Sequence, residues 1–211
     1  MEITNPTVTL LAITPDAEKL IEEAGRTCYL SADKMSDTTT GPFIRRSIKN
    51  AHLSIIEHAS ATFRITGASR SFTHQLVRHR VASFSQQSQR YVNEEDFNYI
   101  IPDSIAGNDQ AAEIYREFML HTQQTYKKLR SLNILKEDAR FILPNALESE
   151  IVFTANFREL RHLFTLRLDR HAQWEIRKAA FAMLKIMMEK APAVFGDFIP
   201  DETDFTASLA E

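Results

Sequence analysis

The chain has 211 residues, a formal net charge of −3 and 44% hydrophobic residues, a composition typical of a globular protein with a sizeable core. The slight negative charge argues against a nucleic-acid-binding protein. The sequence contains no apolar run of about 18 residues, the length that a membrane-spanning helix needs. A single cysteine, Cys28, excludes an internal disulfide and a cysteine-based zinc site. The N-terminus lacks the basic start and apolar core of a signal peptide, so we expect a cytoplasmic protein.

Apolar periodicity predicts the secondary structure. In the first half we expect a strand over 7–13, a helix over 15–28, a loop over 31–40, a helix over 43–51, a turn over 53–56, a strand over 59–66 ended by Gly67, and a helix from Ser69 to His79. In the second half we expect a strand over 97–101, helices over 109–132 and 137–143, a strand over 150–156, helices over 158–168 and 172–190, and a frayed end over 201–211. This irregular alternation favours an α+β fold, a single mixed domain over 1–211 with a central, mostly antiparallel sheet flanked by helices.

The five glycines are widely separated along the chain. No glycine-rich phosphate loop and no G-x-G-x-x-G turn can be built from them. A dinucleotide would therefore have to be bound by side chains and helix ends.

The charge pattern is unusual between His58 and Asn93. This window contains no Asp, Glu or Lys, but it contains five arginines: Arg64, Arg70, Arg78, Arg80 and Arg90. Arginine without lysine indicates forked recognition of phosphate or carboxylate, whereas a solvated basic face would mix in Lys and Glu. Serine hydroxyls and glutamine amides in the same window could complete a nucleotide site. We therefore interpret the window as an anion-binding site.

A second polar cluster lies near the other end of the chain, in Asn156-Phe157-Arg158-Glu159-Leu160-Arg161-His162 and in Leu166-Arg167-Leu168-Asp169-Arg170-His171. Arg167 and His171 would share one face of a continuous helix, or Asp169 could instead cap a new helix. Surface ion pairs, such as Glu159 with Arg158 or Arg161, are an equally good explanation of the residues alone.

Arg78-His79-Arg80, followed seven residues later by Ser88, is similar to the RHR-x7-S signature of the flavin-dependent thymidylate synthases. The chain also resembles this family at His52-x-Ser54-x-x-Glu57-His58, at Arg140 to Pro144, at Asn156-x-Arg158, and at Arg167 with His171 to Glu175. The blocks match in order and spacing from His52 to Glu175. Gln86 stands where some members have Glu, and His162 where some have Asn.

The resemblance implies a site for each ligand. The residues expected to bind the substrate dUMP are Gln75, Arg78, Gln86, Gln87, Ser88, Gln89, Arg90, Arg140 and Arg167. Those expected to bind FAD are His52, Ser54, Arg78, His79, Arg80, Gln86, Asn156, Arg158, His162 and His171. No metal is expected. The resemblance further implies NADPH and 5,10-methylenetetrahydrofolate as co-substrates, and a homotetramer with shared active sites.

The expected chemistry suits these residue types. A nucleoside monophosphate is a dianion that arginines can hold. Carbon 5 of uracil becomes nucleophilic when the anion left by loss of the N3 proton is stabilised, and the permanent cation Arg167 could do this as the catalytic residue. Reduced flavin supplies a hydride and, in this family, carries the methylene group. Cys28 lies near the end of an expected helix, where the partial negative charge does not favour a thiolate, and it is expected to be a small buried group rather than a nucleophile.

Two other functions fit parts of the sequence. A metal-dependent nucleotide phosphohydrolase could use His52, His58, His74 and His79 with Glu57, although the arginine-rich window has no carboxylates for a hard metal. An RNA-binding module could use the arginines with Phe84 and Tyr91 as stacking residues, but the net charge and the lack of lysine oppose it.

Overall fold

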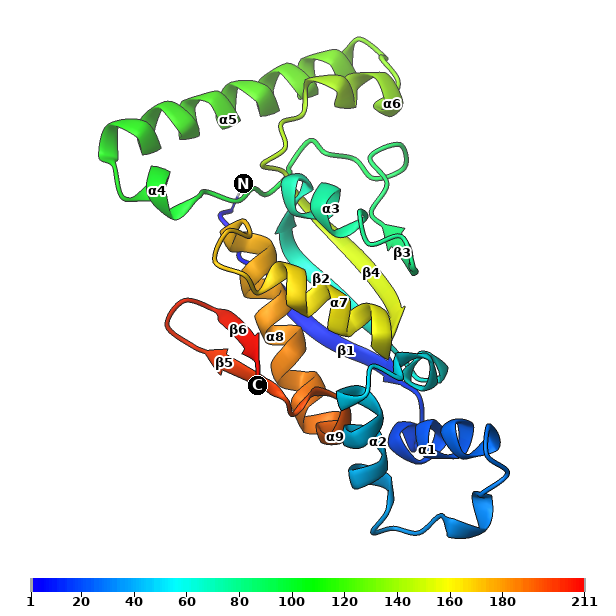
Figure 1. Cartoon of the computed structure of the whole chain (residues 1–211). Coiled ribbons are helices and arrows are strands. Elements are labelled where there is room, and N and C mark those ends of the chain that lie inside the picture. Colours follow the sequence, from blue (N-terminus) through cyan, green and yellow to red (C-terminus); the bar gives the residue numbers. More distant parts are fainter. Residues whose placement is uncertain (1, 211) are drawn as a thin grey trace. The chain divides into compact units, whose positions relative to one another are not determined.

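The computed structural model describes residues 2–210 (Figure 1). It is 49% helical and 20% strand, and its antiparallel sheet and helices confirm the predicted α+β class. Residue contacts divide the chain into two compact units. The first unit comprises the N-terminal residues up to Thr7, Ile65–Gln75 and Ser85–Ile151, and the second comprises Val8–Arg64, Leu76–Phe84 and the chain from Val152 onward.

The chain forms a four-stranded sheet in the order β1-β2-β4-β3. Its strands are β1 (Thr7–Ile13), β2 (Ser60–Ser69), β3 (Ala82–Gln86) and β4 (Glu148–Asn156). Phe63 and Phe153 are fully buried, as the alternating pattern predicts, and Phe84 stacks on Phe153 with ring centroids 5.5 Å apart. The strands expected over 7–13 and 150–156 are therefore confirmed.

The helical segments of the second unit are α1 (Ala17–Thr27), η1 (Ala32–Lys34), α2 (Thr40–Lys49), η2 (Leu53–His58), α7 (Phe157–Arg167), α8 (Trp174–Lys190) and α9 (Pro192–Phe195). The apolar stripe predicted for α8 is buried, including Ile176, Met183 and Met187. Phe195 of α9 packs edge-on against Phe157 and Phe164 of α7. This aromatic core fixes the position of α7 within the unit.

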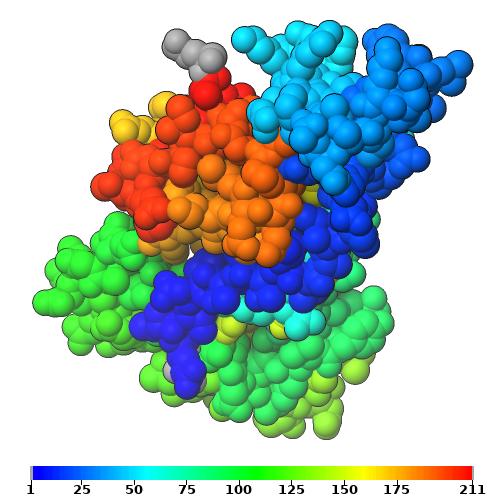
Figure 2. Space-filling model, turned by 90° about the horizontal axis from the view of Figure 1, so that it is seen from below, coloured from blue at the N-terminus to red at the C-terminus, as the bar shows by residue number. Residues whose placement is uncertain are grey.

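The expectation of a frayed C-terminus is wrong for the described residues. Strands β5 (Phe198–Asp201) and β6 (Thr206–Leu209) form an antiparallel hairpin. Phe205 packs edge-on against Phe181 of α8, with ring centroids 5.6 Å apart, and Ala207 N–H donates to the carbonyl of Leu168 at 3.2 Å. Figure 2 shows this red segment against the orange surface of α8 and α9. Tertiary contacts thus order a segment whose composition suggested fraying.

The first unit contains α3 (Arg70–Leu76), α4 (Asp103–Ala106), α5 (Asp109–Ser131), α6 (Lys136–Ala139) and η3 (Arg140–Ile142). Its apolar cluster comprises Phe97, Tyr99, Met119 and Leu147. The strand expected over 97–101 is reduced to isolated bridges at Tyr99, because this stretch lies against that cluster without a continuous partner strand.

Three boundaries near the arginine-rich window differ from the predictions. Strand β2 continues through Gly67 to Ser69, because glycine tolerates the φ of 68° found there and a Cβ would lie 2.2 Å from the carbonyl oxygen of Asn5. Ser69 caps α3 as predicted, since its Oγ accepts a hydrogen bond from Phe72 N at 3.0 Å. Helix α3 ends at Leu76 rather than His79, and residues 82–86 form β3 instead of an irregular segment.

None of the helices formed by residues 2–210 combines the length and the apolar character needed to cross a membrane.

Candidate active site

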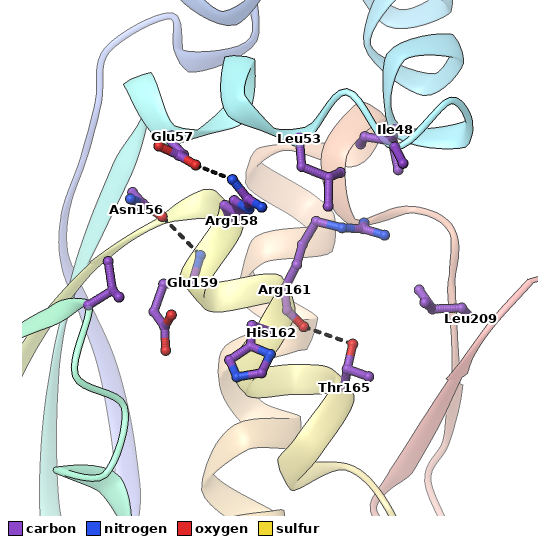
Figure 3. A pocket seen from close by; sticks show the side chains of 12 residues that line it. Ile48, Leu53, Glu57, Asn156, Arg158, Glu159, Arg161, His162, Thr165 and Leu209 are labelled. Atoms are coloured by element: carbon purple, nitrogen blue, oxygen red, sulfur yellow. Dashed lines mark hydrogen bonds and ion pairs between the residues drawn. The ribbon is translucent and has the colours of Figure 1, made fainter.

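The start of α7 positions one group of predicted site residues in the second unit. Asn156 caps the helix, and its Oδ1 accepts a hydrogen bond from Glu159 N at 2.9 Å. Arg158 forms an ion pair with Glu57 of η2. Figure 3 shows both contacts beside His162, at the wall of a cavity of about 670 Å³. The ion pairs suggested from the sequence for Glu159 are wrong, because Arg158 pairs with Glu57 and Arg161 with Asp197.

The Arg78-His79-Arg80 motif lies between α3 and β3 and lines a second cavity, of about 590 Å³. Residues of α7 complete the lining, including His162 and Arg167. Residues from two separate sequence blocks, both expected to bind ligands, are therefore brought together.

His79 is among the residues that line this cavity, and only 4% of its surface is exposed. Its Nδ1 lies 3.0 Å from Oε1 of Glu159, and its Nε2 accepts a hydrogen bond from Nε of Arg167 at 3.1 Å. Burial lowers the pKa of His79, and the positive charge of Arg167 lowers it further, against the opposing effect of Glu159. The imidazole is therefore neutral over a wider pH range than an exposed histidine.

Arg167 itself is partly desolvated. Burial lowers the pKa of its guanidinium, and repulsion from Arg78 acts in the same direction. Arginine remains protonated despite such shifts, so two mutually repelling cations line the same cavity. Such an arrangement favours an anionic ligand, which would relieve the repulsion.

A third cavity, of about 380 Å³, is lined by His52, Ser54, Arg158 and Cys28. It joins the His52 block of the sequence to the start of α7. Cys28 is exposed at the end of α1, so the expectation that it is buried is wrong. The amphipathic pattern of α1 gave no information on what covers the residue that follows its last turn.

The glutamines of the motif lie in the first unit. The amide of Gln86 donates to Oγ1 of Thr73 at 2.9 Å and to Oγ of Ser149 at 3.2 Å, so the protein itself fixes its orientation. Gln75 lies in the last turn of α3, and Gln89 is buried. Of the residues expected to bind dUMP, Arg78 and Arg167 belong to the second unit and the others to the first.

Gln87 is held by two residues that the sequence analysis did not assign to the site. Its side chain donates to Oε1 of Glu94 at 3.2 Å, and its carbonyl accepts from Arg70 at 3.3 Å. Glu94 is buried, and burial raises its pKa. As the first carboxylate after the arginine-rich window, Glu94 could have been noticed by its position, but its burial could not.

The end of the motif contains the predicted phosphate ligands of the first unit. Oγ of Ser88 accepts a hydrogen bond from Arg90 N at 3.3 Å, and Nε of Arg90 lies 3.1 Å from Oε2 of Glu137. Arg140 donates to the carbonyl of Glu137 at 3.1 Å. Glu137 thus connects two arginines from different sequence blocks.

His171 does not line any of the three cavities described above. Helix α7 ends at Arg167, so Arg167 and His171 do not share a continuous helix. His171 is 97% exposed and lies 2.8 Å from Oδ1 of Asp169. The suggestion that Asp169 caps the next helix is wrong, because Gln173 caps α8.

The histidines cited for a metal-dependent hydrolase are not gathered into a ligand set. In the part of the chain that the structure describes, residues 2–210, no group of three or more His, Cys, Asp or Glu could hold a metal ion.

The sequence is similar to a family model and to known flavin-dependent thymidylate synthases. The family model "Thymidylate synthase complementing protein" matches residues 9–193. The flavin-dependent thymidylate synthase of Geobacter sulfurreducens is 41% identical over 201 residues, covering 92% of this chain and 87% of that protein. That of Nitratidesulfovibrio vulgaris is 42% identical over 214 residues, covering 92% and 87%.

Among solved structures, the UMP/dUMP methylase PolB from Streptomyces cacaoi, bound with 5-Br dUMP, matches with a TM-score of 0.84 and 25% identity. The match covers 93% of this chain and 96% of PolB. Together with the joined Arg78-His79-Arg80 and Arg167 blocks, these similarities establish that the chain belongs to the flavin-dependent thymidylate synthase family.

Proposed function

We propose that this protein converts dUMP to dTMP by reductive methylation, with FAD as cofactor, methylenetetrahydrofolate as carbon donor and NADPH as reductant. The observation that carries the proposal is the cavity in which the signature motif and Arg167 meet. The names of the relatives support it, as does the 5-Br dUMP bound to the similar methylase PolB.

The residues present fit a flavin dinucleotide. Its pyrophosphate suits the cations Arg78 and Arg80, which line one cavity, and Arg158, which lines the two others. Its rings suit the apolar side chains of Val77, Val81 and Leu53 in these cavities. Bound FAD supplies the hydride that reduces the transferred carbon. We assign Asn156 a role in fixing the start of α7 beside the cofactor.

The protein's own contribution to the reaction is electrostatic. Arg167 holds the negative charge that uracil gains when its N3 proton is removed, which makes C5 nucleophilic. The desolvated setting of Arg167 strengthens this interaction compared with one in water. Ser88, Arg90 and Arg140 bind the phosphate, and Gln87 the base edge.

We also propose a homotetramer acting in the cytoplasm, where its co-substrates are found. Ile114 and Phe118, four residues apart on α5, are 61% and 53% exposed, which supports coverage of this helix face by another copy. Light scattering coupled to size-exclusion chromatography measures the oligomeric state directly.

The experiment that tests the function separates its two halves. Purified protein should bind FAD and bleach with NADPH, and it should release tritium from dUMP labelled at C5 in the presence of methylenetetrahydrofolate. Arg167→Lys should leave bleaching nearly unchanged but lower tritium release about a hundredfold, because lysine keeps the charge without the fork. The matched control is Arg170→Lys, an exposed arginine paired with Asp204. Wild-type protein that binds FAD without forming dTMP contradicts the proposal.

A further inference from the structure

Both ring nitrogens of the buried His79 are used within the protein. Nδ1 faces Oε1 of Glu159 at 3.0 Å, and Nε2 faces Nε of Arg167 at 3.1 Å. The two partners come from the first and last turns of α7, so one helix contacts the ring at both nitrogens. His79 itself lies outside α7, in the signature motif.

The groups that can donate or accept hydrogen bonds determine which nitrogen of His79 carries a proton. Arginine Nε can only donate, so Nε2 of His79 must be the acceptor and must carry no proton. A neutral imidazole then carries its proton on Nδ1, which donates to the carboxylate of Glu159. A proton on Nε2 would set two donors and two positive charges against each other.

We propose that Glu159 is a positioning residue for Arg167 and acts through His79, an inference that rests on the function proposed above. Glu159 holds His79 in the tautomer whose Nε2 accepts from Arg167. That hydrogen bond anchors the guanidinium of Arg167 at Nε. The contact does not need the two terminal amino groups of the guanidinium, which form the forked pair that recognises planar anions.

The same geometry redefines what His79 offers a ligand. With both nitrogens hydrogen-bonded inside the protein, the ring can contact flavin or substrate only by packing. The histidine of the signature motif therefore acts as a connector rather than as a hydrogen-bonding ligand.

Three ionisable groups of α7 act on His79, namely Glu159, His162 and Arg167. Protonation of His79 breaks the contact with Arg167, so methyl transfer should fall on the acid side. The negative charge of Glu159 favours the protonated ring. Glu159→Gln should therefore shift the pH at which methyl transfer falls to a lower value. A carboxylate with a purely structural role would leave this pH unchanged.

The experiment compares Glu159→Ala and Glu159→Gln, each alone and combined with Arg167→Lys. Thermal stability and flavin content are measured first, then flavin reduction by NADPH and tritium release from C5-labelled dUMP. Glu159→Ala should lower tritium release roughly ten- to hundredfold and flavin reduction less than about threefold. Glu159→Gln should restore most of the activity, because its amide oxygen still accepts from Nδ1.

The double variants identify the route of the effect. Lysine has no Nε donor, so Glu159→Ala should lower tritium release by less than about threefold in the Arg167→Lys background. Asp197→Asn is the matched control, because Asp197 pairs with Arg161 of the same helix at 2.6 Å. It should lower thermal stability without changing the ratio of the two half-reactions.

Nitrogen-15 NMR of labelled histidine tests the arrangement without any turnover. The Nδ1–H tautomer is expected for His79 in the wild type, whatever reaction the protein catalyses, so a failed dTMP assay would not hide the result. The inference is overturned by an Nε2–H tautomer, by parallel loss of both half-reactions in folded Glu159→Ala, or by multiplying effects in the double variant. If Glu159→Ala does not fold, the pH shift of Glu159→Gln and the tautomer of His79 in the wild type decide.

Discussion

Arg90 forms an ion pair that a ligand could readily replace. It and Glu137 are 53% and 45% exposed, and exposed pairs of this kind contribute at most about 1 kcal/mol to stability. A phosphate dianion would be a stronger partner for the guanidinium than this half-solvated carboxylate.

Arg90→Ala should weaken dUMP binding about ten- to hundredfold and change flavin binding little, because one charge-assisted contact is lost. Titration of dUMP followed by the flavin absorbance measures both. Glu137→Gln is the control, because it removes only the competing carboxylate and should leave dUMP affinity equal or tighter. Loss of FAD with unchanged dUMP affinity would assign Arg90 to the other ligand.

Cys28→Ala should retain most of the activity and stability. Cys28 is exposed at the end of α1 and lines a cavity with His52 and Ser54, so it leaves little packing to lose. Tritium release and dTMP formation are the readouts. Complete loss of both in a folded, FAD-loaded variant would show that a protein thiol takes part in the reaction.

At the scale of elements, a buried carboxylate connects α1 with the start of α2. Glu22 is fully buried, and Oε1 accepts from Nε of Arg26 at 2.7 Å and from Oγ1 of Thr39 at 2.8 Å. Its Oε2 accepts from Oγ1 of Thr40 at 2.6 Å. Burial acts to raise the pKa of Glu22, but the hydrogen bonds from Thr40, Thr39 and Arg26 outweigh it and hold the pKa below the usual value.

Glu22→Ala should lower the free energy of unfolding by about 3–5 kcal/mol, because it leaves Arg26 buried without its partner. Since the folded-state pKa is depressed, this stabilisation is present above about pH 4.5 and is lost as the pH falls further. Urea denaturation of the wild type and the variant, once at neutral pH and once well below pH 4.5, measures the difference in the free energy of unfolding. Glu23→Ala, at the exposed neighbouring position, should change little, and an equal loss in both variants would refute the role of the network.

At the scale of the whole molecule, local patterns predicted most elements and failed where distant contacts decide. The alternation over 150–156 was sufficient to predict a strand, and the apolar stripe of α8 was sufficient to predict a helix. Each pattern describes a single buried face. The hairpin of β5 and β6 was missed, since Phe205 is ordered by Phe181 rather than by its neighbours. Local patterns cannot report such a contact.

The candidate site divides in the same way. The signature motif and the later block predicted Arg78, His79, Arg80 and Arg167 as site residues by residue type and spacing, and these four residues line one cavity. Glu159 resembled a surface ion-pair partner because its real partner, His79, lies 80 residues away in sequence. Which carboxylate meets which imidazole depends on how α7 packs, and packing is not encoded in a short motif.

The second unit is assembled from Val8–Arg64, Leu76–Phe84 and the chain from Val152 onward, and this has a consequence for synthesis on the ribosome. A nascent chain emerges N-terminal end first, at about 5–20 residues per second, and contacts between distant segments form slowly. The long stretch Ser85–Ile151 of the first unit is complete before α7 has been translated. His79 can therefore contact Glu159 and Arg167 only after α7 has been translated, so the cavity lined by these residues is completed late in synthesis.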